Sequence, residues 1–207
     1  MRILFQGDSI TDADRSRTDN SRLGVGYARL VEASLGFDEP GKHEFFNRGI
    51  SGNRIVDLYA RIKCDIINLK PDVMSILIGV NDVWHETGEN PNGVDNEKFF
   101  KIYSMLIEEV KEALPNIKIM ILEPFVLKGC STELHWDYFS KEVPMRAAMS
   151  RKIAEKYNLP FVELQAGFDK LAEAAPNEYW LGDGVHPSAK GHEFIKREWL
   201  KTFENMI

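Results

Sequence analysis

Two residues suited to acid–base chemistry stand close together near the end of the chain. The stretch "LGDGVHPS", residues 181–188, places the carboxylate of Asp183 three residues before the imidazole of His186. Residues three apart in a turn can have Cα atoms under ~7 Å from each other. Asp183 can then accept a hydrogen bond from Nδ1–H of His186, which fixes the tautomer and leaves Nε2 free to face a nucleophile. This spacing predicts a general base with its orienting acid, and a nucleophile elsewhere in the chain.

Three other short segments carry polar groups of complementary chemistry. "GDSITDADR", from residue 7, contains the hydroxyl of Ser9, "GISGN" contains Gly52, and "IGVND" contains Asn81. Taken singly, these residues are typical of a helix cap, a glycine with positive φ and a turn. Together with the acid–imidazole pair they supply a nucleophile, N–H donors for an oxyanion and a base. These groups are the requirements of acyl transfer.

A regular alternation of strands and helices predicts how the four segments are brought together. The apolar pattern predicts strands at 2–5, 43–48, 72–79, 118–123 and 160–164. It predicts helices at 26–35, 55–68, 96–113, 141–157, 166–175 and 188–203. This alternation is typical of a three-layer α/β/α sandwich with a five-stranded parallel sheet, formed by one domain over residues 1–207. Sites in such sheets lie at the carboxyl ends of the strands, where all four segments fall.

The four segments resemble the sequence blocks of the SGNH hydrolases, also called GDSL-like esterases or lipases. "GDSI", "GISGN", "IGVND" and "DGVH" occur in the order of that family, and the resemblance runs from Gly7 to His192. Ile10 occupies the position of the leucine in the GDSL motif that gives the family its name. The phrases "YWLGDGVHP" and "GVNDVW" also resemble a cytoplasmic subgroup of acetylxylan esterases and lysophospholipase-like esterases. The resemblance implies the flavodoxin-like fold of these hydrolases and a serine esterase that acts through an acyl-enzyme.

The resemblance also implies a role for each matching residue. Ser9 is expected to be the nucleophile, His186 the general base, and Asp183 the acid that orients it. The oxyanion hole is expected to consist of the backbone N–H groups of Ser9 and Gly52 and the side-chain amide of Asn81.

Aromatic side chains near these segments are candidates for substrate contacts. Trp84 lies three residues after Asn81, and Trp180 lies three residues before Asp183. Trp136 lies in the polar stretch "ELHWDY". Aromatic faces suit sugar rings, although packing in the core is the alternative for Trp84 and Trp180. His85 and Asp8 are further candidates for the substrate site. For Asp8, hydrogen bonding that fixes the nucleophile loop is the alternative.

The segments around the site favour a small, polar substrate. Residues 12–25 and 85–97 are polar and offer no apolar lid for a long acyl chain. We therefore expect acetyl esters of oligosaccharides, with a lysophospholipase or an acyl thioesterase as alternatives. An acyl-CoA substrate would favour basic residues at the mouth of the site, and Arg15, Arg17 and Arg22 are consistent with that alternative. A non-catalytic carbohydrate-binding domain is a further alternative, but such a domain is expected to lose the catalytic residues that this chain retains.

Composition excludes several other classes of function. The chain has 207 residues and a net charge of −6, which disfavours nucleic acid and anionic membrane surfaces as partners. No apolar run approaches ~18 residues and no signal peptide is visible, so we expect a cytoplasmic protein. Cys64 and Cys130 are expected to be reduced, and without zinc-ligand spacing we expect no metal or cofactor. The aromatic segment 124–140, expected to be a long irregular connection, makes a homo-oligomer possible.

Overall fold

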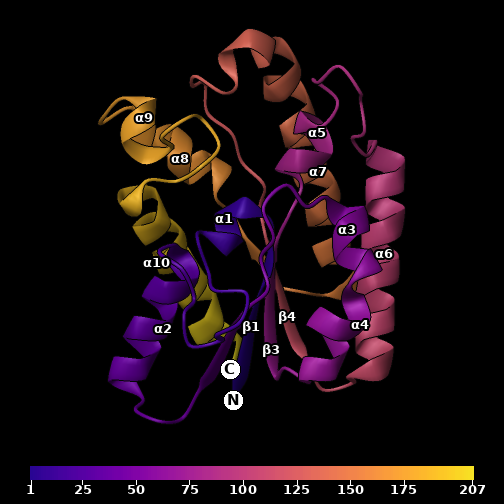
Figure 1. The fold of residues 1–207 in the computed structure, drawn as a ribbon, viewed down its shortest axis with the longest axis vertical. Helices are drawn as coiled ribbons and strands as arrows, with labels where there is room; N and C mark the ends of the chain where they lie inside the picture. The colour runs from indigo at the N-terminus through magenta and orange to yellow at the C-terminus, as the bar shows by residue number, and fades with distance from the viewer.

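A five-stranded parallel sheet runs through the centre of the computed structural model, which describes residues 1–207 (Figure 1). Its strands are β1 (Arg2–Gly7), β2 (Glu44–Asn47), β3 (Val73–Leu77), β4 (Lys118–Leu122) and β5 (Phe161–Val162). The order across the sheet is β2-β1-β3-β4-β5, and neighbouring strands are parallel. All five residues of β3 are buried, as expected for a strand covered on both faces. The predicted sandwich is confirmed.

Helices cover both faces of the sheet (Figure 1). One face carries α2 (Tyr27–Asp38), α8 (Gln165–Ala172) and α10 (Ala189–Met206). The other carries α3 (Ile55–Ala60), α4 (Ile62–Asp65), α6 (Asn96–Ala113) and α7 (Trp136–Tyr157), with a 3₁₀ turn at Ile67–Leu69. The two apolar cores contain 25 and 19 buried residues. Strand β1 serves both, since Ile3 and Phe5 point into the first core and Leu4 into the second.

Some predicted boundaries differ from the structure. The helix expected at 55–68 is divided into α3, α4 and the 3₁₀ turn, because Arg61 leaves helical geometry at φ −112°. Its guanidinium turns toward the sheet and donates to the backbone carbonyls of Gly7 and Arg48. Strand β5 is only two residues long and pairs with Ile121 and Leu122 alone.

The segment 124–140 is less irregular than predicted. A 3₁₀ turn at Glu133–His135 leads directly into α7, which begins at Trp136 rather than at residue 141. Pro144 lies inside α7, in its third turn. The fully buried ring of Phe139 packs edge-to-face on Trp84, and this tertiary contact lies in the additional turn.

The strand order creates a defined place for a site. From β1 the chain crosses to β2 on one side and then to β3 on the other, so the direction reverses between β1 and β3. The crevice at such a reversal, beyond the carboxyl ends of the strands, is where open α/β sheets bind ligands. Two short helices begin there: α1 (Ser9–Asp12) follows β1, and α5 (Val80–Trp84) follows β3. No helix combines the length and apolarity needed to cross a membrane.

Candidate active site

The nucleophile loop is held by a local cap. Ser9 is the first residue of α1, two residues after β1 ends. The side chain of Asp8 accepts a hydrogen bond from the N–H of Ile10 at 3.0 Å. Asp8 is only 1% exposed, and burial raises its pKa to about 7, against the lowering effect of the Ile10 N–H. The carboxyl therefore lies beneath the loop and shapes it, rather than facing solvent as a substrate contact.

A chain of hydrogen bonds joins the three residues predicted to act as a triad. Ser9 Oγ lies 2.8 Å from Nε2 of His186, although the two residues are 177 positions apart in the sequence. Nδ1 of the same imidazole lies 2.8 Å from Oδ2 of Asp183. Both distances are within the range of strong hydrogen bonds. This arrangement lets the imidazole take the proton of the hydroxyl while the carboxylate holds its tautomer.

The loop that carries the acid and the base is closed on itself. Oδ1 of Asp183 accepts from the backbone N–H groups of Val185 at 2.9 Å and of His186 at 2.8 Å. Leu181 and Pro187 form an antiparallel bridge across the loop. The side chain of Ser188 then caps α10, as predicted, and the loop is anchored at both ends.

Sequence reasoning missed one partner of this loop. Ser131 Oγ donates to Oδ2 of Asp183 at 3.1 Å, and the Ser131 N–H donates to the Asp183 carbonyl at 3.0 Å. Ser131 lies 52 residues earlier, in the connection before α7. No local sequence signal links the two segments, because only the packing of the β4–α7 connection against the triad loop brings them together.

The electrostatics of the pair favour an imidazole that readily accepts a proton. The hydrogen bond that His186 donates to Asp183 raises the pKa of His186 above its ordinary value, and this effect outweighs burial, which lowers it. Burial raises the pKa of Asp183, but the hydrogen bonds from His186 and Val185 outweigh burial and hold this pKa well below its ordinary range. Asp183 is therefore ionised at neutral pH, and its charge favours the protonated form of the neighbouring imidazole.

The groups predicted to be oxyanion donors lie on the two neighbouring loops. Gly52 has φ +81°, which requires glycine or strains any other residue, and no acceptor in the protein receives its backbone N–H. Asn81, in the first turn of α5, is 5% exposed, and its Nδ2 donates to the carbonyl of Asn53 at 3.2 Å. That bond holds the side-chain amide next to the Gly52 turn.

Asp82 ties the same two loops together and was not singled out from the sequence. Its carboxyl oxygens lie 3.1 and 3.3 Å from the N–H of Ile55, the first residue of α3. Asn81 and Asp82 therefore bind both ends of the segment 53–55. The signal available in the sequence was the "ND" pair itself, which has no meaning without the neighbouring loop.

The predicted aromatic residues do not all lie at the same place. Trp84 lies beside the triad, with its ring centre 6.0 Å from that of His186. Trp136 lines a different cavity with Lys128, Pro144 and other residues from the β4–α7 connection, α7 and α8. Trp180 lines a separate cavity, against α10, and its Nε1 is buried without a partner. The spacing that placed Trp180 near the triad in sequence does not bring its ring to it.

The remaining histidines have other surroundings. His85 follows the last turn of α5, and burial together with the charge of Arg54 lowers its pKa. Nδ1 of His192 accepts a hydrogen bond from the N–H of Tyr27 at 3.1 Å, so it joins α10 to α2. No group of three or more histidine, cysteine or acidic side chains is placed to hold a metal ion.

Comparison with known protein families identifies the family of this chain. The model of the GDSL-like lipase/acylhydrolase family matches residues 5–194. The chain belongs to this family. It is therefore a carboxylic ester hydrolase, and a purely carbohydrate-binding role is set aside. The family model spans all four segments from which the site is built.

Relatives of this GDSL-like hydrolase include proteins described as esterases and hydrolases. An acetylxylan esterase from Geobacillus stearothermophilus is 34% identical over 97% of this chain and 92% of its own. A solved structure of an acetylxylan esterase from that organism superposes with a TM-score of 0.87 at 32% identity, covering 97% of this chain and 93% of that one. An α/β hydrolase from the metagenome of Lake Arreo gives a TM-score of 0.88 at 26% identity, over 100% and 96% of the two chains.

Proposed function

We propose that this protein is a serine esterase that removes acetyl groups from acetylated oligosaccharides through an acyl-enzyme. The observation that carries the proposal is the continuous contact of Ser9 Oγ, the His186 imidazole and the Asp183 carboxylate, each 2.8 Å from the next. The donors of Gly52 and Asn81 at the same edge complete the requirements of acyl transfer.

In the first half-reaction, Ser9 Oγ attacks the ester carbonyl while Nε2 of His186 takes the hydroxyl proton. The negative charge that develops on the carbonyl oxygen is stabilised by the N–H groups of Ser9 and Gly52 and by Nδ2 of Asn81. When the tetrahedral intermediate collapses, the C–O bond to the alcohol breaks and His186 returns its proton to the leaving oxygen. The acetyl group remains on Ser9.

In the second half-reaction, water takes the place of the alcohol. His186 accepts a proton from the water as the water attacks the acetyl carbonyl, and the same donors stabilise the second oxyanion. Collapse releases acetate and returns the proton to Ser9 Oγ. Asp183 remains ionised throughout and stabilises the imidazolium at each proton transfer.

The choice of an acetylated sugar is supported by three features. The Geobacillus relatives carry the descriptions acetylxylan esterase and, for two variant structures, acetyl-xylooligosaccharide esterase. The side chain of His186 is 44% exposed, so the triad lies in an open position suited to a short acyl group on a polar alcohol. Trp84 beside His186 offers an aromatic face to a sugar ring.

The test is a substitution at the nucleophile combined with a panel of esters. Ser9→Ala should lower kcat by about 10⁴–10⁶-fold with an unchanged melting temperature, because the nucleophile is removed from an intact fold. A serine-reactive phosphonate should label Ser9 and leave Ser51 and Ser131 unmodified. The wild type should hydrolyse acetyl esters with higher kcat/KM than butyryl or octanoyl esters, and acetylated xylooligosaccharides better than lysophospholipids. Labelling at Ser131, or a preference for long acyl chains, would contradict the proposal.

A further inference from the structure

Arginine pairing reveals an exception beside the active site. Every arginine in the chain forms an ion pair with a carboxylate except Arg15 and Arg22. Both lie in the segment that follows α1, close to the nucleophile in the chain. Arg22 is exposed and is solvated by water, so its lack of a partner needs no explanation. Arg15 is only partly exposed, and its guanidinium lacks an anion at a position where water solvates it incompletely.

The hydrogen bonds of Arg15 leave much of its guanidinium available. Its Nε donates to the carbonyl of Gly49 at 2.7 Å and its Nη1 to the carbonyl of Ser16 at 3.2 Å. Because a guanidinium has five N–H groups, three remain without a protein acceptor. Both acceptors are neutral carbonyls, which fix the orientation of the side chain without neutralising its charge. Arg15 is thus held in one direction with free donors, as a preformed anion site requires.

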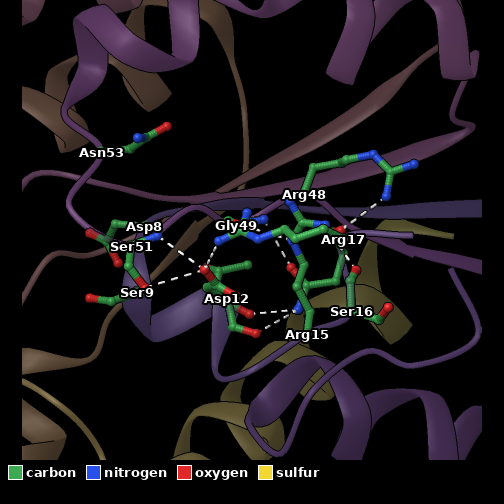
Figure 2. Close-up of polar contacts among 12 residues, drawn as sticks. Asp8, Ser9, Asp12, Arg15, Ser16, Arg17, Arg48, Gly49, Ser51 and Asn53 are labelled. Carbon is green, nitrogen blue, oxygen red and sulfur yellow. Dashed lines mark hydrogen bonds and ion pairs between the residues drawn. The ribbon is translucent and has the colours of Figure 1, made fainter. Parts of the chain in front are cut away.

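A second guanidinium shares a carbonyl acceptor with the first. Nη1 of Arg17 donates to the same carbonyl of Gly49, at 3.2 Å, and its Nη2 donates to Oδ2 of Asp12 at 2.5 Å. Figure 2 shows Asp12 between Ser51 and the arginine side chains. Oδ2 of Asp12 also accepts from the N–H and the hydroxyl of Ser51, so this oxygen is shared among three donor groups.

The cluster carries an excess of positive charge in an otherwise acidic protein. Arg48 lies 3.7 Å from Asp65, which is already paired with Arg61 at 2.9 Å. The cluster thus consists of four arginines and only two carboxylates, although the whole chain has a net charge of −6. Its members are Arg15, Arg17, Arg48 and Arg61, with Asp12 and Asp65. Burial and then the charge of Arg17 lower the pKa of Arg15 to about 10. A bound anion would offset the repulsion that this arrangement creates.

The position of the cluster connects it to the reaction. Gly49 lies three residues before Gly52, in the turn after β2, and Asp12 lies three residues after Ser9, at the end of α1. Arg15 and Arg17 both donate to the carbonyl of Gly49, and Arg17 also donates to the carboxylate of Asp12. A group bound by these arginines therefore lies next to the loops that supply the nucleophile and the oxyanion donor (Figure 2).

We propose that Arg15, with Arg17 beside it, forms a subsite for an anionic oxygen group, a carboxylate or a phosphate, on the molecule that carries the ester. The inference rests on the proposed esterase activity and specifies its substrate. If the substrate is an oligosaccharide, the group is the carboxylate of an acidic sugar unit near the acetylated one. The same fork of donors also fits a phosphate, as found on a sugar phosphate or coenzyme A.

Direct binding tests the subsite without turnover of an ester. Calorimetry at constant ionic strength would measure the Kd of sodium glucuronate, inorganic phosphate and neutral xylose for the wild type, Arg15→Lys, Arg15→Gln and the matched control Arg29→Gln. Arg29 carries the same charge but lies on α2, paired with Glu32. We expect an anion to bind the wild type and Arg29→Gln alike, with affinity at least about tenfold weaker in Arg15→Gln and intermediate in Arg15→Lys. Equal anion affinity in the wild type and Arg15→Gln, or no anion binding to the wild type, would overturn the subsite.

Substrate preference identifies the source of the anion. The ratio of kcat/KM for acetylated oligosaccharides with and without a glucuronic acid unit should exceed about ten in the wild type and in Arg29→Gln, and approach one in Arg15→Gln. A second ratio compares kcat/KM for the thioester acetyl-CoA with kcat/KM for an uncharged acetyl thioester. If this ratio, and not the oligosaccharide ratio, falls toward one in Arg15→Gln, the subsite stands with a phosphate ligand and the oligosaccharide proposal fails. A ratio near one in the wild type for both ester classes would reject a role of the arginines in substrate choice. Arg15→Lys keeps a charge and covers the case in which Arg15→Gln does not fold.

Discussion

His186 occupies the centre of the site, between a hydroxyl and a carboxylate, and in the proposed mechanism its charge state controls the reaction. A general base must be neutral to take a proton, so the hydrogen bond that His186 donates to Asp183 has two effects. It strengthens the imidazole as a base and, by raising its pKa, keeps the ring protonated to a higher pH. The side chain is 44% exposed, so solvent screens part of this effect.

The activity should therefore rise with pH through an apparent pKa above 6.5, the ordinary value for histidine. The physical reason is that protonated His186 cannot accept the proton of Ser9, and Asp183 stabilises that protonated form. A pH profile of kcat/KM with an acetyl ester measures the rising limb, and an NMR titration of His186 in Ser9→Ala checks the assignment. His192→Gln serves as the control and should keep the same limb. An apparent pKa below 6.5 would contradict the geometry of the Asp183 contact.

Asn81 should act on the transition state rather than on substrate binding. The negative charge on the carbonyl oxygen develops only as the tetrahedral intermediate forms, so a donor aimed at it affects kcat more than KM. Asn81→Ala should lower kcat by about 10²–10³-fold, roughly 3–4 kcal/mol, with little change in KM. Asn81→Asp should be at least as impaired, because a carboxylate repels the oxyanion. The melting temperature of the same preparations separates this role from a structural one, since a loss of activity that only follows unfolding would reject it.

At the scale of elements, α5 positions two loops at once. Asn81 binds the carbonyl of Asn53, and Asp82 accepts from the N–H of Ile55. The helix begins after Gly79, whose φ of +139° is strained for other residues, and a Cβ there would lie 3.0 Å from Pro124. This glycine lets the chain turn from β3 directly into α5. The short helix therefore depends on its neighbours, not on its own propensity, for its position.

Asp82 offers a test of that dependence. Asp82→Ala leaves the buried N–H of Ile55 without an acceptor, which costs about 1–3 kcal/mol and loosens the turn that carries Gly52. We expect kcat to fall by about tenfold with KM little changed, whereas Asp82→Asn, which keeps one acceptor oxygen, should retain most of the activity. Steady-state kinetics and melting temperatures of both variants measure this difference. Equal kcat values for Asp82→Ala and the wild type would show that the loops hold their positions without the carboxyl.

At the scale of the whole molecule, two separate apolar cores hold the sheet edge that carries the site. α2 and α10 close one of them, and His192 links these helices by accepting the Tyr27 N–H. The two rings are stacked with centroids 6.4 Å apart. Burial and the nearby charge of His186 lower the pKa of His192 to about 4. The folded protein thus keeps this imidazole neutral at a pH where the unfolded chain takes up a proton.

Stability should therefore decline as pH falls from 6.5 toward 4, because the unfolded state binds the additional proton in that window. A shift of this size corresponds to at most about 3 kcal/mol from His192 alone. His192→Gln removes the titrating group and keeps an amide oxygen that can accept a hydrogen bond. Its free energy of unfolding, measured in urea at pH 7, 5 and 4, should be lower than that of the wild type at pH 7 but should decrease less toward pH 4. Parallel pH dependences of the two proteins would contradict the assigned role.

The sequence by itself determined the elements with strong local signals. The helix at 96–113 has its predicted bounds because the cap at Asp95, the apolar periodicity and the stop at Pro115 are all local. The alternation of strands and helices was enough to predict the sandwich, and the rule for the carboxyl ends of strands placed the four polar segments at one edge. The acid–base pair was also predictable, since its members are three residues apart.

Only the tertiary structure decided which distant groups meet. The contact of Ser131 with Asp183 spans 52 residues, and the pairing of Arg17 with Asp12 beside the unpaired Arg15 depends on how the chain after α1 folds over the β2–α3 turn. The rings of Trp136 and Trp180 face other cavities because a side chain follows the face of its own element rather than its spacing from a catalytic residue. Periodicity and capping act within a few residues, and a strand or helix can be predicted from them. The burial and hydrogen bonding that position a site act between segments far apart in the chain, so they are decided only when the whole fold packs.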